Sequence, residues 1–230
     1  MYNELKYWYL RDHKLFWTLS MSQIKQLCII TDFKTAKKGD LIQFSSSDLP
    51  MIYLLKKGKL KIVSIDMEGN ETIKEIISKG DLFGELSLEY DKNINEYAKV
   101  LSDEVSICSF LISDFEELLT KNPALSLTYI KFIGFKLKRL KNNYSNLISK
   151  DAKTRLATFL IEWATKEGEN KGEKVLIDNY LTQNDIAQLI CTSRQTTALL
   201  LNDLKEKNII NYSRNQIIIN DISKLKSYFT

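Results

Sequence analysis

Histidine and cysteine are scarce in this sequence, and their scarcity excludes several classes of protein. The 230 residues include one histidine, His13, and three cysteines that lie far apart, Cys28, Cys108 and Cys191. A Ser-His-Asp triad or a histidine metal site would have to be built around His13 alone. No CxxC pair indicates zinc, an iron–sulfur cluster or a disulfide framework. We therefore expect no catalytic residue, no metal ligand and no enzymatic activity.

Proline and glycine are also few, with two and eight residues respectively, which argues against disorder and collagen-like structure. No apolar run approaches the roughly 18 residues of a membrane span. The first residues, MYNELKYWYLRDHKLF, lack an apolar core followed by a small-residue cleavage site, so they are not expected to form a signal peptide. We expect a cytoplasmic protein without a membrane partner.

Charge does not identify a partner. The formal net charge of +4 is mildly basic, which is compatible with a polyanionic partner but does not demand one. Basic and acidic side chains nearly balance over residues 151–230. A hypothesis of DNA binding must therefore rest on a motif.

The first half of the chain changes from helical to β-rich patterning. Residues 1–30 place apolar groups at helical spacing, with Ser22 as a possible cap of the second segment. Between residues 35 and 110, short β-rich runs recur at intervals of roughly 10–12 residues with glycines between them, which predicts a sandwich, barrel or roll. The runs are DLIQF, MIYLLKKG, KLKIVSID, ETIKEIIS, YAKVLS and EVSICSFL.

A short helix is predicted around residues 114–120, and Pro123 then begins a long helix that reaches about Ser149. Apolar residues along this long helix follow the 3-4 spacing of an a/d heptad seam. They are Ile130, Ile133, Leu137, Leu140, Tyr144 and Leu147. Such a stripe can pack on its own domain or on a second copy of the chain, and its narrowness favours a parallel homodimer.

The segment after this helix alternates between helical and polar patterns. Lys150-Asp151 is a plausible hinge, and residues 152–167 are amphipathic. GENKGEK is predicted to be a polar loop, and VLIDNYLT a short strand that enters the next helix.

A helix-turn-helix pattern follows. Thr182 and Asp185 fit a capping box, the first helix continues to about Ile190, and Ser193 caps a second helix after a short turn. Residues 209–212 and 216–219 alternate like two strands around a polar hairpin tip. This order of elements is the winged helix-turn-helix pattern. The competing interpretation is a helical pair in the accessory domain of an enzyme.

The polar residues of this region form a candidate DNA-binding set. Arg194 can pair with guanine and Gln195 with adenine, while hydroxyls and free N–H groups at the helix start suit phosphates. Lys207 and Arg214, near the wing, would contact the DNA backbone. The full set is Thr182, Thr192, Ser193, Arg194, Gln195, Thr196, Lys207 and Arg214.

TQNDIAQLICTSRQTTALLLNDLKEKNII resembles the DNA-reading unit of the Crp/Fnr regulators, and KKGD, YLLKKGKLKI and GDLFGELSL are similar to the β-roll of the cyclic-nucleotide-binding fold. The resemblance covers about residues 20–220. It implies an α+β fold with a jelly-roll-like, double-stranded β-roll sensor domain (1–122), a dimerisation helix (123–149) and a winged helix-turn-helix domain (150–230). It also implies double-stranded DNA, a second copy of the chain and RNA polymerase as partners.

The sequence departs from this family at the effector site. Nucleotide-binding members carry an Arg-Ser or Arg-Thr pair where this chain has Asn95 and Glu96, so a charge-assisted phosphate contact is lost and a negative charge is added. Leu140-Lys141 replaces small polar groups on the dimer helix. We therefore expect no cofactor and no control by cyclic AMP. The candidates for an effector pocket are Gly84, Glu85, Leu86, Asn95, Glu96, Tyr97 and Leu140.

The DNA-reading helix departs as well. Arg194 keeps the family's central arginine, but Gln195 replaces a glutamate and Leu199 a second arginine, which implies a different operator half-site. The sequence thus predicts a dimeric, sequence-specific transcriptional regulator that binds an inverted repeat. The alternative is a cyclic-nucleotide-dependent signalling module in which DNA binding is secondary, and the helix-turn-helix pattern argues against it.

Overall fold

The structure is a computed structural model, and it describes residues 10–11, 13–30, 32–43, 51–84 and 96–227. The chain divides into two compact units, residues 1–137 and 138–230, so the long helix α4 (Pro123–Ser149) belongs to both. None of the helices within the described ranges is long and apolar enough to cross a membrane.

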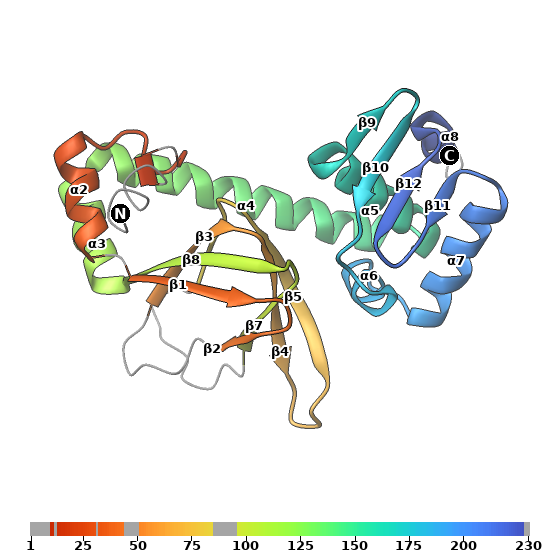
Figure 1. Ribbon diagram of the computed structural model, residues 1–230, viewed down its shortest axis with the longest axis horizontal. Helices are drawn as coiled ribbons and strands as arrows, with labels where there is room; N and C mark the ends of the chain where they lie inside the picture. The colour runs from red at the N-terminus through yellow and green to blue at the C-terminus, as the bar shows by residue number, and fades with distance from the viewer. Residues whose placement is uncertain (1–9, 12, 31, 44–50, 85–95, 228–230) are drawn as a thin grey trace. The chain divides into compact units, whose positions relative to one another are not determined.

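The first unit contains two antiparallel four-stranded sheets, with strand orders β1-β8-β3-β6 and β2-β7-β4-β5 (Figure 1). Within the described ranges, α2 precedes these strands and α3 and α4 follow them. The elements are α2 (Met21–Ile30), β1 (Asp32–Lys37), β2 (Leu41–Gln43), β3 (Met51–Lys57), β4 (Lys59–Ile65), β5 (Glu71–Ser78), β6 (Leu82–Phe83), β7 (Glu96–Val100), β8 (Glu104–Leu111), α3 (Ile112–Lys121) and the first part of α4.

The two sheets enclose one apolar core. Alternate residues of each strand point into it, because successive side chains of a strand face opposite sides of its sheet. Tyr53 and Phe83 stack there with ring centroids 5.2 Å apart. The other members of this core are Leu55, Leu60, Ile62, Ile77, Ala98, Val100, Val105 and Ile107.

A second core lies on the other face of β3 and β8, where the helices pack. Ile52, Leu54 and Phe110 from the sheet meet Leu125 of α4 and further apolar groups of α2 and α3. Each fully buried leucine or isoleucine stabilises the fold by roughly 1.5–3 kcal/mol. This core is therefore what holds the start of α4 against the β-roll.

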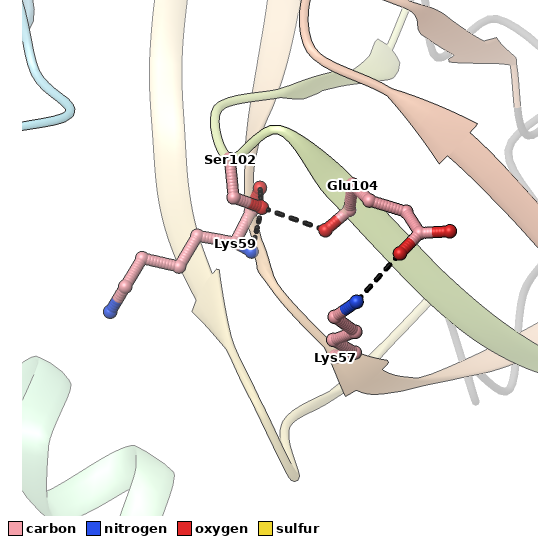
Figure 2. A network of polar contacts seen from close by, with 4 residues as sticks. All are labelled: Lys57, Lys59, Ser102 and Glu104. Atoms are coloured by element: carbon pink, nitrogen blue, oxygen red, sulfur yellow. Dashed lines mark hydrogen bonds and ion pairs between the residues drawn. The ribbon is translucent and has the colours of Figure 1, made fainter.

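Gly58 makes the β3–β4 turn, and the surrounding polar groups leave no room for a side chain. Its φ is +84°, and a Cβ there would overlap the carbonyl oxygen of Glu104 and the hydroxyl of Ser102. Figure 2 shows the network at this turn, in which Lys57 Nζ lies 2.6 Å from Glu104 Oε2 and the Lys59 N–H donates to Ser102 Oγ at 2.9 Å. The Lys57 ammonium lowers the pKa of Glu104 through this hydrogen bond.

The second unit has one antiparallel sheet, with strand order β11-β12-β10-β9, and helices around it. Its elements after α4 are α5 (Ala152–Glu167), β9 (Glu169–Lys171), β10 (Lys174–Asp178), α6 (Gln183–Leu189), α7 (Arg194–Glu206), β11 (Ile210–Tyr212), β12 (Gln216–Ile219) and α8 (Ile222–Ser227). In Figure 1 these elements run from green to blue.

A polar cluster fixes the end of α5 to the chain that leads into α6. Glu167 accepts from Trp163 Nε1 at 3.0 Å and from the Tyr180 hydroxyl at 3.1 Å. Burial, together with the nearby Glu167 charge, raises the pKa of Tyr180. The remaining core of this unit is mostly apolar, with Asn179, Asp185 and Thr197 as its buried polar residues, and includes Leu156, Leu160, Ile177, Ile186, Leu201, Ile210, Ile217 and Ile219.

Most of the elements expected from the sequence are present, and the β-rich runs correspond to β2, β3, β4, β5, β7 and β8. Two expectations are wrong. The GENKGEK segment is not a loop but contains β9 and the turn into β10, where Gly172 has a φ of +66°, whereas the strand expected within VLIDNYLT is present as β10. Ser20, and not Ser22, exchanges capping hydrogen bonds with Gln23 at the start of α2.

His13 couples the N-terminal segment to the β-roll, and its pKa generates a prediction. Its Nε2 lies 2.9 Å from the Gly80 carbonyl oxygen, and its Nδ1 accepts from the Leu15 N–H at 3.2 Å, which requires the neutral ring with the proton on Nε2. Burial lowers the pKa of His13 below its ordinary value, although the Gly80 carbonyl and Asp81 oppose this shift.

Because the folded state holds His13 neutral, the unfolded state binds more protons as the pH falls below about 6.5. The free energy of unfolding should therefore decrease from pH 7.5 to pH 5.5 in the natural protein. A His13→Gln variant should lose less stability over that interval, as measured by urea midpoints at both pH values. Equal losses in the two proteins would contradict this prediction.

Candidate nucleic-acid interface

The first helix of the motif, α6, starts with a complete capping box. Thr182 Oγ1 accepts from the Asp185 N–H at 3.1 Å, and Asp185 Oδ2 accepts from the Thr182 N–H at 2.9 Å. Asp185 is buried, whereas Thr182 is exposed. The expected box is thus confirmed, and it fixes the start of α6 while leaving Thr182 accessible from outside.

Arg155 of α5 stabilises the turn between α6 and α7. Its guanidinium donates to the carbonyl oxygens of Ile190 at 2.8 Å and Cys191 at 3.1 Å, and to that of Lys150 at 2.6 Å. Cys191 has a φ of +51°, which is uncommon for a residue with a Cβ. Arg155 therefore stabilises a turn that the local sequence does not favour. This role was not predicted from the sequence.

Ser193 caps the second helix, α7, as expected. Its Oγ accepts from the Thr196 N–H at 3.0 Å and lies 2.9 Å from the Thr196 hydroxyl. No acidic residue lies in the first turn, which contains Arg194 and Gln195, both exposed. The partial positive charge of a helix N-terminus and the nearby arginine both favour a phosphate or a base edge with acceptor atoms.

One face of α7 is polar and exposed, and the other is buried. Gln195, Leu199 and Asn202 are exposed and follow a 4-3 spacing, so they form one stripe along the helix. Thr197, Leu201 and Leu204 are buried on the opposite side. Asn202 was missed by the sequence analysis, although its spacing from Gln195 and Leu199 could have identified it.

The wing is the β11–β12 hairpin, and Arg214 lies exposed at its tip. Thr192 and Thr196 are half-buried beside the turn and the start of α7. Lys207 lies at the other end of α7, about 20 Å from Ser193 along a 13-residue helix. Its Nζ lies 2.8 Å from Asp203 Oδ1. The structure therefore brings together the candidates around the turn, but not Lys207.

The seam of α4 is exposed in the single chain. The exposed fractions are 65% for Ile130, 43% for Ile133, 51% for Leu137, 65% for Leu140, 66% for Tyr144 and 40% for Leu147. Other residues of α4, Leu125, Tyr129 and Phe132, pack against the core of the first unit. Lys136 belongs to the same roll-facing side and donates to the Leu82 carbonyl oxygen at 2.9 Å. The helix thus has one side packed on its own roll and a second, apolar side that is open.

The candidates for an effector pocket are only partly described. Glu85, Leu86 and Asn95 lie outside the described residues, and Leu140 belongs to the second unit. Gly84 has a φ of +93°, so it serves a turn that excludes other residues. Glu96 is half-buried and alternates onto the inner face of β7 with Ala98.

Tyr97 is placed on the opposite face of β7 from Ala98. There it is buried, and burial together with a hydrogen bond to Glu71 raises its pKa to about 12. The structure therefore does not bring Tyr97 into the inter-sheet core with the other strand positions.

Two family models match separate parts of the chain. Residues 33–122 match the cyclic nucleotide-binding domain, and residues 154–228 match the Crp-like helix-turn-helix domain. The CRP-like cAMP-activated global transcriptional regulator of Mycobacterium tuberculosis is 28% identical over 174 residues, which cover 76% of this chain and 77% of that protein. The global nitrogen regulator of Nostoc sp. is 27% identical over 198 residues, covering 86% of this chain and 89% of that protein.

Solved structures share the fold. A CooA variant from Carboxydothermus hydrogenoformans has a TM-score of 0.73 at 24% identity, covering 96% of this chain and 98% of that one. FixK2 from Bradyrhizobium japonicum has a TM-score of 0.70 at 16% identity, covering 87% and 98% of the two chains.

The capped helix pair, the wing and the β-roll define a DNA-binding transcriptional regulator with a winged helix-turn-helix. The chain belongs to the Crp/Fnr family of such regulators. The Mycobacterium tuberculosis relative is named as a transcriptional regulator and the Nostoc relative as a nitrogen regulator, which favours this function over a signalling module in which DNA binding is secondary.

Proposed function

We propose that this regulator acts as a homodimer that binds an inverted-repeat operator through α7 and is not controlled by cyclic AMP. The proposal assigns no catalytic step to the chain. It places the protein in the cytoplasm with the DNA and includes RNA polymerase as a partner. The observation that carries it is that the chain has both an exposed, mainly polar stripe on α7 and an exposed apolar seam on α4.

The reading function rests on the first turn of α7 and its polar stripe. Arg194 can make a bidentate contact to guanine O6 and N7, and Gln195 or Asn202 can pair with adenine. Leu199, which is 65% exposed, offers only an apolar contact of the kind that suits a thymine methyl group. The half-site should therefore combine one strongly specified guanine with more weakly specified A·T positions.

The dimer rests on the two-sided packing of α4. An aliphatic and aromatic seam that is 40–66% exposed in one chain costs free energy in water, and a parallel copy would bury it. Because a symmetric dimer presents two copies of α7, its operator should be an inverted repeat with half-sites about one helical turn apart.

Independence from cyclic AMP rests on the charges in the β-roll. Residues 33–122 contain no arginine, so the segment that matches the cyclic nucleotide-binding domain cannot supply a bidentate guanidinium contact to a phosphate. Glu96 lies on the inner face of β7. Its carboxylate would repel a phosphate bound there.

The first test removes the arginine of the reading turn. Arg194→Ala should flatten the preference at one base position of the operator and cost about 1–3 kcal/mol of specific binding. In vitro selection with natural protein and variant measures this directly. Recovery of the same motif with the same base weights would show that Arg194 does not read a base.

Arg214→Ala serves as the contrast, because a phosphate contact at the wing should weaken all sequences alike. Lys207→Ala removes the same charge at the far end of α7, where Asp203 already pairs with it. It should weaken binding less than Arg214→Ala does.

The second test places charge in the seam. Replacing Ile133 and Leu140 with Asp should raise the dimer dissociation constant by at least about 100-fold, since two apolar groups per protomer, each contributing roughly 2 kcal/mol, are lost. Phe135→Asp is the matched control, because Phe135 is 66% exposed on the same helix but lies off the seam. Sedimentation should show monomers only for the double variant. An intact dimer for the double variant, or monomers for the control, would refute the seam.

The third test concerns the effector. Calorimetry with cyclic AMP and cyclic GMP should detect no binding at ligand concentrations on the order of tens of micromolar. The Mycobacterium tuberculosis relative, which is named as cAMP-activated, is the positive control in the same buffer. A micromolar affinity for either nucleotide would overturn this part of the proposal.

A further inference from the structure

Asn179 lies between β10 and α6, where the strand next to the wing leads into the helix-turn-helix. It is buried, and three of its polar groups are engaged within the second unit. Its side-chain Nδ2 donates to the Ser213 carbonyl oxygen at 3.0 Å, and its backbone N–H donates to the Asn215 carbonyl oxygen at 2.9 Å. Its Oδ1 accepts from the Leu181 N–H at 3.1 Å.

The two wing carbonyls that Asn179 binds lie on either side of Arg214. The Ser213–Gln216 loop also closes on itself, because the Ser213 N–H and hydroxyl both donate to the Gln216 carbonyl oxygen, at 2.8 and 3.0 Å. The tip of the wing is therefore fixed from within by Ser213 and from outside by Asn179. The side chain of Arg214 stays exposed.

We propose that Asn179 is a positioning residue for the wing: it holds the hairpin tip against the end of β10 and so presents Arg214 to the DNA backbone. This inference rests on the proposed contact between Arg214 and a phosphate. A loop that is ordered before binding loses less conformational entropy when it contacts a ligand. Without the Asn179 amide, the tip would become ordered only when it contacts DNA. The conformational entropy lost at that point would lower the DNA affinity.

The link to Leu181 adds a second consequence. Leu181 precedes Thr182, the residue that caps α6. A single buried side chain thus connects the wing tip to the start of the helix-turn-helix. The wing tip is therefore fixed to the start of the helix-turn-helix within the same unit.

The test is a double-mutant cycle on operator affinity with Asn179→Ala and Arg214→Ala. Asn179→Ala alone should weaken binding about 3- to 10-fold for operator and non-specific DNA alike, without changing base preferences. It should also lower the steepness of the salt dependence, and Arg214→Ala should do the same because it removes a phosphate contact. In the Arg214→Ala background, Asn179→Ala should have little further effect, because it acts through that arginine.

Asn220→Ala is the matched control. Asn220 also uses its amide to hold a backbone carbonyl, that of Asn208 at 3.1 Å, but at the base of the wing. It should reduce stability without changing the salt dependence of DNA binding. Thermal unfolding of every variant establishes that binding is measured on folded protein.

The outcomes separate this inference from the proposed function. Loss of affinity with Arg214→Ala but not with Asn179→Ala overturns the inference and leaves the wing contact standing. Equal, additive losses from Asn179→Ala in both backgrounds also overturn it. If Arg214→Ala changes nothing, the wing contact and the inference both fail. If Asn179→Ala does not fold, hydrogen exchange on the natural protein decides, since the Asn179 and Leu181 amides must be protected, and exchange at the rate of exposed amides overturns the inference.

Discussion

The DNA-binding unit depends on how the carbonyl groups at the end of α6 are satisfied. A helix leaves its last carbonyls without helical partners, and a tight turn with a positive φ at Cys191 adds a strained residue to that end. Arg155 satisfies these carbonyls and stabilises the turn with one planar guanidinium, which donates to the carbonyl oxygens of Ile190 and Cys191 together. The same group also reaches the Lys150 carbonyl, just past the end of α4. The turn between α6 and α7, and with it the placement of the exposed side of α7, therefore depends on a residue of α5.

The long helix α4 shows how one element can have two different apolar sides. Leu125, Tyr129 and Phe132 face the core of the first unit, and the seam from Ile130 to Leu147 lies along another side of the helix. An amphipathic helix needs only one such stripe to pack on its own domain. The second stripe has no partner among the described residues of the chain, which is why we propose that a second copy of the chain covers it. A heptad seam suits a second helix of the same kind, since knobs-into-holes packing requires a matching 3-4 spacing.

Elements with strong periodicity were predicted from the sequence. Features that depend on contacts with residues distant in the sequence were not. The seam, the capping box at Thr182 and the cap at Ser193 were all predicted, because each depends on residues within about one turn of one another. β9 and its pairing with β10 were missed, since β9 is only three residues long, polar and exposed, whereas the apolar residues of β10 indicated a strand. The roles of Arg155 and Asn179 were missed because each side chain binds, besides a nearby backbone group, at least one carbonyl oxygen more than 30 residues away. Asn202 could have been predicted from its helical spacing, but the predicted DNA-binding set on α7 covered only the first turn of the helix.

The β-roll can keep its fold while its ligand chemistry changes, because different residues carry the two. Its stability comes from apolar side chains between the sheets, such as Leu60, Ile62 and Val100, and none of these could bind a phosphate. The charged positions at the strand ends contribute little to this core. Losing an arginine there removes a binding group but leaves no buried charge without a partner, so such a change has little effect on folding. Because different residues carry the fold and the ligand chemistry, regulators with different effectors can be equally similar to this chain. Its identity is 28% to a relative named as cAMP-activated and 27% to one named as a nitrogen regulator. The β-roll and the helix-turn-helix of this chain both match family models, whereas the effector must be established from the residues inside the roll.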